Sequence, residues 1–199
     1  MNKKIWTFPY SVAPQNQSKV VASIVMGFAD DPTARWCWPD AETYLNVMSD
    51  WTLACGDKAF GLGTALFNEG CGALWLPPGI TSDEERLDEL VKKTMTVKQQ
   101  ETVALLFEKL SPFEPDLPHW YLPLIGADVT ARGKGAGTLL MQSISQECDE
   151  HGDTAYLVCS NPSNVDFYQR HGFEVMDHVY AGDFPVMIPM IRAPLNPAP

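Results

Sequence analysis

The chain has 199 residues, of which 45% are hydrophobic and 20% are charged. This length suits one sizeable core better than two marginal ones, so we expect a single domain over 1–199 with a loose tail over 193–199. The formal net charge of −11 repels phosphate backbones and argues against nucleic acid as a partner. Such acidity suits an amine-bearing partner, or it serves solubility alone.

The cysteines and the apolar segments indicate the compartment. The five cysteines are scattered and form no C-x-x-C pair, so we expect neither a disulfide framework nor a zinc site. Residues 1–9 lack the long apolar run of a signal peptide. No apolar stretch approaches the length of a membrane-spanning helix. We therefore expect a cytoplasmic protein with reduced thiols and no metal.

The first part of the chain predicts two helices. Apolar residues recur at helical spacing over 17–28, and Asp30-Asp31-Pro32 then ends the helix. An aromatic-rich loop is expected over 35–40, and a second helix over 40–53.

A hairpin and a long helix are expected next. Apolar runs over 59–67 and 72–76 flank Asn68-Glu69-Gly70, and Asn and Gly tolerate the positive φ of a tight turn. Ser82 and Glu85 fit a capping box. The helical pattern behind this box continues as far as Ser111-Pro112.

The second half alternates strands with helices after a proline-containing connector over 112–118. This alternation predicts an α/β fold. The expected elements are strands over 119–129, 154–159, 173–180 and 186–191, and helices over 133–150 and 163–171.

A glycine-rich loop, Arg132-Gly133-Lys134-Gly135-Ala136-Gly137, joins a predicted strand to a predicted helix. Its glycines leave backbone amides uncovered at the positive end of the helix, which is an anion site. Arg132 and Lys134 add cations, so a pyrophosphate is the natural guest. The spacing fits neither a Walker loop nor a dinucleotide fingerprint. A glycine-rich turn without a ligand is the alternative.

Two motifs resemble those of the GNAT acetyltransferases. The spacing Arg132-x-x-Gly135-x-Gly137 resembles their acetyl-CoA signature, and 124–129 resembles the strand that carries the pantetheine arm. Residues 160–173 resemble the second motif, in which an Asn precedes Phe-Tyr and Gly-Phe. More patchily, 27–35 and 118–122 look like segments of the puromycin N-acetyltransferase group.

The resemblance implies the GNAT fold: α/β, with a mixed, mostly antiparallel central sheet, flanking helices and a splayed central pair of parallel strands. It also implies transfer of the acetyl group of acetyl-CoA to the primary amine of a small molecule by direct attack. Tyr168 would protonate the leaving CoA thiolate. Backbone amides of 125–127 would supply the oxyanion donor. The expected cofactor-binding residues are Ile125, Gly126, Ala127, Arg132, Gly133, Lys134, Gly135, Ala136, Gly137 and Asn164.

No pattern assigns the general base, and ordered water is an alternative. Several residues are candidates by type, and each also suits a structural or solvent-exposed role: His119, Tyr121, Asp30, Asp31 and Glu174. Three tryptophans could stack on a flat or cationic substrate or simply pack: Trp36, Trp38 and Trp75.

Other functions stay open at this point. Acetylation of a protein N-terminus or lysine is one alternative, and a non-catalytic acetyl-CoA sensor is another. Many relatives in the GNAT group are homodimers, so we expect a possible homodimer without a residue-level reason.

Overall fold

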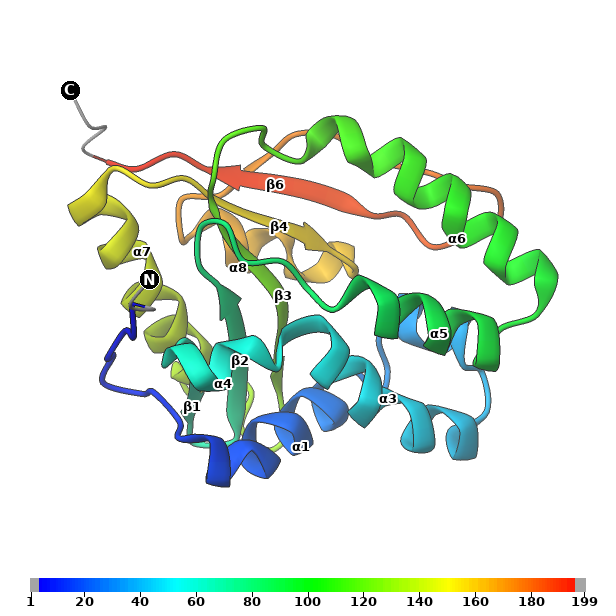
Figure 1. Ribbon diagram of the computed structural model, residues 1–199, viewed down its shortest axis with the longest axis horizontal. Coiled ribbons are helices and arrows are strands. Elements are labelled where there is room, and N and C mark those ends of the chain that lie inside the picture. Colours follow the sequence, from blue (N-terminus) through cyan, green and yellow to red (C-terminus); the bar gives the residue numbers. More distant parts are fainter. Residues whose placement is uncertain (1–3, 196–199) are drawn as a thin grey trace.

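A six-stranded sheet forms the centre of the computed structural model, which describes residues 4–195 (Figure 1). The strand order is β1-β2-β3-β4-β6-β5, and only β3 and β4 pair in parallel. This confirms the predicted mixed, mostly antiparallel sheet with a central parallel pair. The strands are β1 (Ala65–Asn68), β2 (Cys71–Leu76), β3 (Trp120–Ala127), β4 (Ala155–Cys159), β5 (Glu174–Val175) and β6 (Ile188–Arg192).

Helices pack on both faces of the sheet and bury two core clusters. In Figure 1, α7 lies at the left and α5 and α6 at the right. Ile24, Met48 and Leu124 belong to one cluster, and Leu140 and Trp120 belong to the other. The helices are α1 (Gln17–Gly27), α2 (Pro32–Cys37), α3 (Ala41–Gly56), α4 (Lys58–Leu62), α5 (Glu84–Thr94), α6 (Val97–Leu110), α7 (Ala136–His151) and α8 (Val165–Gln169).

The two parallel strands separate along their length. Pairing of β3 with β4 ends at Leu122, although β3 continues to Ala127 beside β2. A β-bulge interrupts β3 between Tyr121 and Leu124, where it has one residue more than β2. Pro123 lies in this bulge, one of the few places where a sheet tolerates proline. A bulge bends its strand, so β3 diverges from β4, and the predicted splay is confirmed.

The predicted hairpin is correct at its turn but not in its first strand. Residues 59–62 belong to the helix α4, which ends where Gly63 adopts a left-handed φ of 77°. A short apolar run has no periodicity that separates a buried helix from a strand. The turn places positive φ at Glu69 (43°) and Gly70 (80°), while Asn68 still belongs to β1.

The long helix expected after this hairpin is two helices. Ser82 does not cap, because its Oγ donates to the Cys55 carbonyl, and Asp83 caps α5 instead. The helix α5 stops at Thr94. A capping box of Thr96 and Gln99 then starts α6, a pattern that the sequence does contain.

Three other boundaries also differ from the predictions. Part of the predicted 35–40 loop is helical, because Asp31 caps α2 and Pro32 occupies its first turn. The helix α7 starts at Ala136 rather than at 133. The predicted 173–180 strand is reduced to β5 and an isolated bridge from Val179 to Met187, since the chain loops away towards α6.

The predicted tail over 193–199 falls partly outside the described residues, which end at 195. The described part is anchored, since the Leu195 N–H donates to Asp149 Oδ1 over 2.8 Å. None of the helices within residues 4–195 is both long and apolar enough to cross a membrane.

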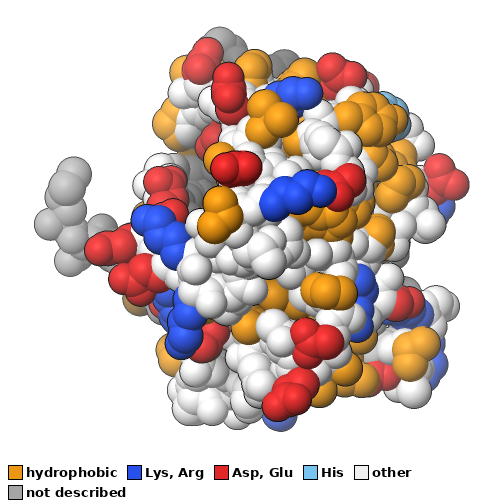
Figure 2. Space-filling view, turned by 90° about the vertical axis from the view of Figure 1, so that its right-hand side faces the viewer, with side chains coloured by type: hydrophobic (Ala, Val, Ile, Leu, Met, Phe, Trp, Pro, Cys, Tyr) orange, Lys and Arg blue, Asp and Glu red, His pale blue; other side chains and the backbone are white. Residues whose placement is uncertain are grey.

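The surface of the face drawn in Figure 2 mixes acidic, basic and hydrophobic side chains. The acidic excess of the sequence is therefore not gathered into one patch on this face.

Candidate active site

The separation of β3 from β4 leaves backbone groups of β3 unpaired. The Trp120 N–H donates to Thr154 on the β4 side, and the Asp128 N–H donates to Gly70 beside β2. Successive strand residues direct these groups to opposite edges. Counting back from Asp128, the N–H groups of Ala127 and Ile125 point into the gap. They are the two donors that this strand offers there.

Gly126 lies between these two residues and was expected with them to bind the cofactor. In the structure its missing side chain allows α1 to pack closely against β3. A Cβ at this position would lie 2.8 Å from the Ile24 Cα, so α1 crosses directly over the strand. The close approach requires glycine, and it sets α1 over the end of β3.

The glycine-rich loop leads from β3 into α7. Gly133 and Gly135 have φ of 76° and 85°, a region that favours glycine. Gly135 is the N-cap residue and has no side chain, so the first amides of α7 are uncapped. A Cβ at Gly133 or Gly135 would meet nothing within 4 Å. The loop therefore presents free amides to open space, which is the arrangement of an anion site.

Gly137, the last glycine of the signature, faces inward instead. A Cβ there would lie 3.4 Å from the Phe167 ring and 3.7 Å from Cys71 Sγ. Its missing side chain makes room for α8 against α7, and its predicted contact with the cofactor remains a prediction.

The two predicted cations of the loop behave differently. Lys134 is exposed and forms no ion pair within residues 4–195. Arg132 Nη2 donates to the Gly27 carbonyl over 3.0 Å and to Asp30 Oδ1 over 3.2 Å. Its Nε donates to the Ala127 carbonyl over 3.3 Å. The Arg132 hydrogen bond holds the pKa of Asp30 below its ordinary value.

Tyr168 lies buried on α8, edge-on to Phe167 with the ring centroids 5.3 Å apart. Burial, followed by the neighbouring Cys159, Asp31 and Cys71, raises the pKa of Tyr168. The hydroxyl is therefore protonated at neutral pH. Within residues 4–195, no hydrogen bond to the Tyr168 hydroxyl contributes to this pKa shift.

Asp31 is the buried carboxylate of this region, with a side chain from the turn between α1 and α2. The residue is 5% exposed. Its Oδ1 accepts the N–H groups of Thr33 and Ala34 over 3.0 and 3.1 Å, and its Oδ2 accepts the Ser160 hydroxyl over 2.8 Å. Burial raises the pKa of Asp31 above its ordinary value, because desolvation disfavours the charged form.

The start of α2 and the end of β4 are linked a second time. Thr33 Oγ1 donates to the Ser160 carbonyl over 3.3 Å. Together with the bond to Asp31, this places the carboxylate at the end of β4, where the two parallel strands are already apart.

The other candidate bases lie elsewhere. Asp30 is exposed and paired with Arg132. Glu174 is exposed on β5, at the edge of the sheet. His119 and Tyr121 are at the start of β3, where the strands still pair, and both rings contact Tyr156. Of the five candidates, only Asp31 is near enough to Tyr168 for its charge to contribute to the raised pKa of that phenol.

Asn164 occupies the N-cap position of α8 but its side chain does not cap the helix. It is exposed, so the amide is free to bind a ligand. Its predicted contact with the pantetheine amides remains a prediction.

Two of the three tryptophans considered for substrate stacking are core residues. Trp38 and Trp75 are 2% and 1% exposed, and Trp38 Nε1 donates to Thr94. Trp36 is only half-buried, with its ring 4.6 Å from that of Phe184. It alone stays a candidate for contact with a substrate.

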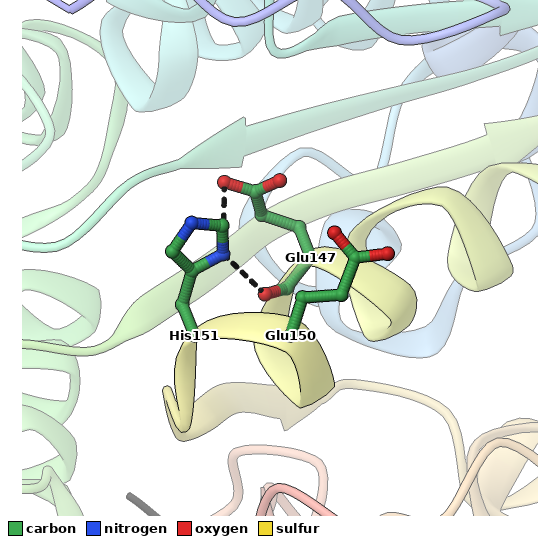
Figure 3. Close-up of side chains that lie close together, drawn as sticks. All are labelled: Glu147, Glu150 and His151. Atoms are coloured by element: carbon green, nitrogen blue, oxygen red, sulfur yellow. Dashed lines mark hydrogen bonds and ion pairs between the residues drawn. The ribbon is translucent and has the colours of Figure 1, made fainter.

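The last turns of α7 carry a group of side chains with the spacing of metal ligands: Glu147, Glu150 and His151 (Figure 3). Glu147 Oε1 already accepts hydrogen bonds from Trp6 Nε1 and Lys4 Nζ, over 3.0 and 3.2 Å. The group lies at the opposite end of α7 from the glycine-rich loop, and we assign no metal to it.

Two residues of this site were not singled out in the sequence. Ser160 lies within the second motif and directly follows β4, which was the available signal. Pro123 interrupts a strongly apolar strand, and a proline in a central strand indicates a bulge.

Comparison with known proteins supports the fold and matches part of the chain to a family model. Residues 119–193 match the family model described as Acetyltransferase (GNAT) domain. A Corynebacterium glutamicum structure described as histone acetyltransferase HPA2 and related acetyltransferase has 21% identity and a TM-score of 0.65, covering 95% of this chain and 97% of the other.

Two insect enzymes share the same fold at lower identity. Arylalkylamine N-acetyltransferase 2 from Aedes aegypti has 12% identity and a TM-score of 0.61, covering 92% of this chain and 96% of its own. The polyamine N-acetyltransferase of Drosophila melanogaster, described as forming N-acetylagmatine, has 13% identity and a TM-score of 0.57, covering 92% and 98%. At these identities the similarity concerns the fold.

Proposed function

We propose that this chain is an acetyltransferase of the GNAT superfamily and that it transfers the acetyl group of acetyl-CoA to the primary amine of a small molecule. The observation that carries the proposal is the position of Asp31, which Ser160 holds at the end of β4 where β3 and β4 separate, and which is near enough to Tyr168 for its charge to raise the pKa of that phenol. The Asp31 carboxylate can accept a proton and the Tyr168 hydroxyl can donate one. The glycine-rich loop follows the same strand and offers the anion site that a CoA pyrophosphate needs.

Cofactor binding follows from the unpaired groups. The uncapped amides of α7 and the Lys134 ammonium would hold the pyrophosphate, and Asn164 would contact the pantetheine arm. The N–H groups of Ile125 and Ala127 lie along the gap. One of them would donate to the thioester oxygen, on which negative charge develops as the amine attacks.

Proton movement balances between two side chains. The attacking nitrogen forms its bond to the acetyl carbon and loses a proton to Asp31, while the carbon–sulfur bond breaks and the sulfur takes a proton from Tyr168. Exchange with solvent then returns Asp31 and Tyr168 to their starting states. The products are an N-acetylated amine and CoA with a free thiol.

The local environment makes Tyr168 a reasonable donor to sulfur. Burial raises the pKa of the neighbouring thiols of Cys71 and Cys159 to about 11 each. A CoA thiolate in the same desolvated space would likewise be a stronger base than in water. The raised pKa of Tyr168 is therefore matched by a raised proton affinity of the group it serves.

Similar structures support a small amine as the acceptor. Their descriptions name agmatine and arylalkylamines as substrate classes. A puromycin-like aminonucleoside, a polyamine or an amino-sugar all belong to the proposed class. Acetylation of a protein amine and an acetyl-CoA sensor are the alternatives, and the uncommitted hydroxyl of Tyr168 favours an enzyme over a sensor. The expected homodimer and the cytoplasmic location stay predictions.

A thiol-release assay with acetyl-CoA and a panel of amines tests the proposal. The panel contains polyamines, arylalkylamines, amino-sugars, an aminonucleoside and peptides with a free N-terminus. Acetylation of small amines is the expected result. Acetylation of peptides alone would overturn the small-molecule proposal, and tight cofactor binding without any acceptor would favour the sensor.

A further inference from the structure

The Arg132 side chain joins three segments of the chain. It donates to the carbonyl of Gly27 at the end of α1, to the carboxylate of Asp30 in the following turn, and to the carbonyl of Ala127 at the end of β3. The carbonyl of Gly27 is one of the last in its helix, and such carbonyls lack intrahelical partners. These contacts use Nε and Nη2 and leave only Nη1 outside them.

The segments that Arg132 joins are also packed closely against one another. A Cβ at Gly27 would lie 2.7 Å from the Ala127 nitrogen, so no side chain separates α1 from β3 here. The chain then turns, with the Asp31 N–H donating to the Phe28 carbonyl over 3.1 Å. Asp31 therefore follows directly after the carboxylate that Arg132 holds.

We propose that Arg132 is a positioning residue, which fixes the turn containing Asp30 and thereby aims the Asp31 carboxylate into the gap. Binding of the phosphates is left to Lys134 and the backbone amides of α7. The inference rests on the proposed function, because it takes Asp31 as the general base. It assigns Arg132, part of the acetyl-CoA signature, to the acceptor side of the reaction.

A positioning role and a phosphate-binding role respond differently to Arg132→Lys. Lysine keeps the charge that a phosphate needs, but its single ammonium cannot reproduce the fork that contacts three acceptors. We therefore expect the affinity for CoA to stay within about threefold of wild type, while kcat with a saturating amine falls by about tenfold or more. Arg132→Gln should behave in the same way, although it loses the charge.

Asp30→Asn provides the partner variant. It weakens the hold on the turn, so we expect a smaller loss of kcat and an unchanged affinity for CoA. Combined with Arg132→Lys, it should cost little more than Arg132→Lys alone, because residues that act through one contact are not additive. Arg86→Lys is the matched control, since Arg86 on α5 forms a similar exposed pair with Asp50 on α3 over 3.1 Å. It should change neither readout.

The measurements are the calorimetric Kd for CoA, the steady-state kcat and KM for the amine, and the thermal midpoint of each variant. The positioning role is overturned if Arg132→Gln loses CoA affinity by about tenfold or more while kcat at saturation is kept. It is also overturned if Asp30→Asn tightens CoA binding, since Arg132 would then be a phosphate ligand held back by Asp30.

Failure of the proposed function gives a different result. If the wild-type protein acetylates no amine, kcat cannot be measured and the proposed function fails. The calorimetric Kd for CoA still decides the role of Arg132, because it can be compared between Arg132→Gln and Lys134→Gln. A positioning residue predicts that only Lys134→Gln weakens CoA binding.

Discussion

The Ser160 hydroxyl donates a hydrogen bond to Asp31 Oδ2 over 2.8 Å, across 129 positions of sequence. This bond joins the turn before α2 to the end of β4. It also leaves Asp31 with a pKa that burial has raised and that Ser160 partly lowers again. The carboxylate is thus held in place and has a higher proton affinity than an exposed aspartate.

Asp31→Asn should separate activity from stability. The amide can still cap α2 and still pair with Ser160, so the geometry is kept. Loss of a general base should lower kcat/KM by about 100-fold. The folded-state pKa of Asp31 is raised, so its ionisation at neutral pH costs stability. We therefore expect the thermal midpoint of the variant at pH 7 to equal or exceed that of wild type.

The matched control is Asp40→Asn at the N-cap of α3. There the hydrogen bond from Thr43 lowers the pKa of the aspartate, so the sign is reversed and the variant should lose a little stability at pH 7 without losing activity. A wild-type rate in Asp31→Asn would exclude Asp31 as the base.

Ser160→Ala should shift the pH profile of kcat/KM. The base must be deprotonated, so activity is lost as pH falls through the raised pKa of Asp31. The Ser160 hydrogen bond stabilises the charged form, and its removal raises that pKa further. We expect the acidic limb to move to higher pH, with Ser163→Ala, which alters a nearby exposed hydroxyl, as the control. A shift to lower pH, or none, would contradict this.

Tyr168→Phe should slow the chemical step. The substitution keeps the ring against Phe167 and removes only the hydroxyl. Protonation by a positioned group contributes about 10²- to 10⁴-fold, and we expect a loss of about tenfold or more because a thiolate can leave without help. Single-turnover CoA release is the measurement, since slow product release can hide the effect.

The control for Tyr168→Phe is its calorimetric affinity for acetyl-CoA, which should stay near that of wild type. Wild-type Tyr168 should also show no loss of activity from its own ionisation up to pH 9, because burial raises its pKa. An unchanged rate of the chemical step in Tyr168→Phe would mean that the sulfur takes its proton from water rather than from Tyr168.

Gly135→Asp should weaken acetyl-CoA binding by at least about tenfold, roughly 1.4 kcal/mol. It adds a carboxylate above the open loop, where the pyrophosphate would lie. Gly135→Ala is the control, because it imposes the same strain at φ 85° without charge. Equal calorimetric affinities for the two variants would mean that the pyrophosphate does not bind at this loop. Gly137→Asp cannot replace it, since its Cβ would lie against Phe167.

The second half of the fold was predictable because its apolar runs and its glycine loop are local signals. The first half was less so. The run over 59–67 covers most of α4 and the start of β1, and only Gly63, which has a left-handed φ, and Thr64 separate them. The break before α6 was missed although Thr96 and Gln99 fit a capping box.

The candidate site likewise contains residues that local sequence signals identified and residues that only tertiary contacts revealed. Lys134 and Tyr168 lie within motifs, so the sequence was sufficient to single them out. The choice of Asp31 among five candidate bases needed the tertiary contact with Ser160. The contact of Arg132 with Asp30 likewise spans 102 positions, and no spacing rule predicts it.

The most direct test of the account is the single-turnover formation of CoA and N-acetylated amine by wild-type protein and by Asp31→Asn, both saturated with acetyl-CoA. Equal molar amounts of the two products from wild type, and a rate about 100-fold lower in the variant, are predicted. Bound acetyl-CoA that no amine on the panel consumes would contradict an acetyltransferase active on small amines. Equal rates in the two proteins would contradict the assignment of the base.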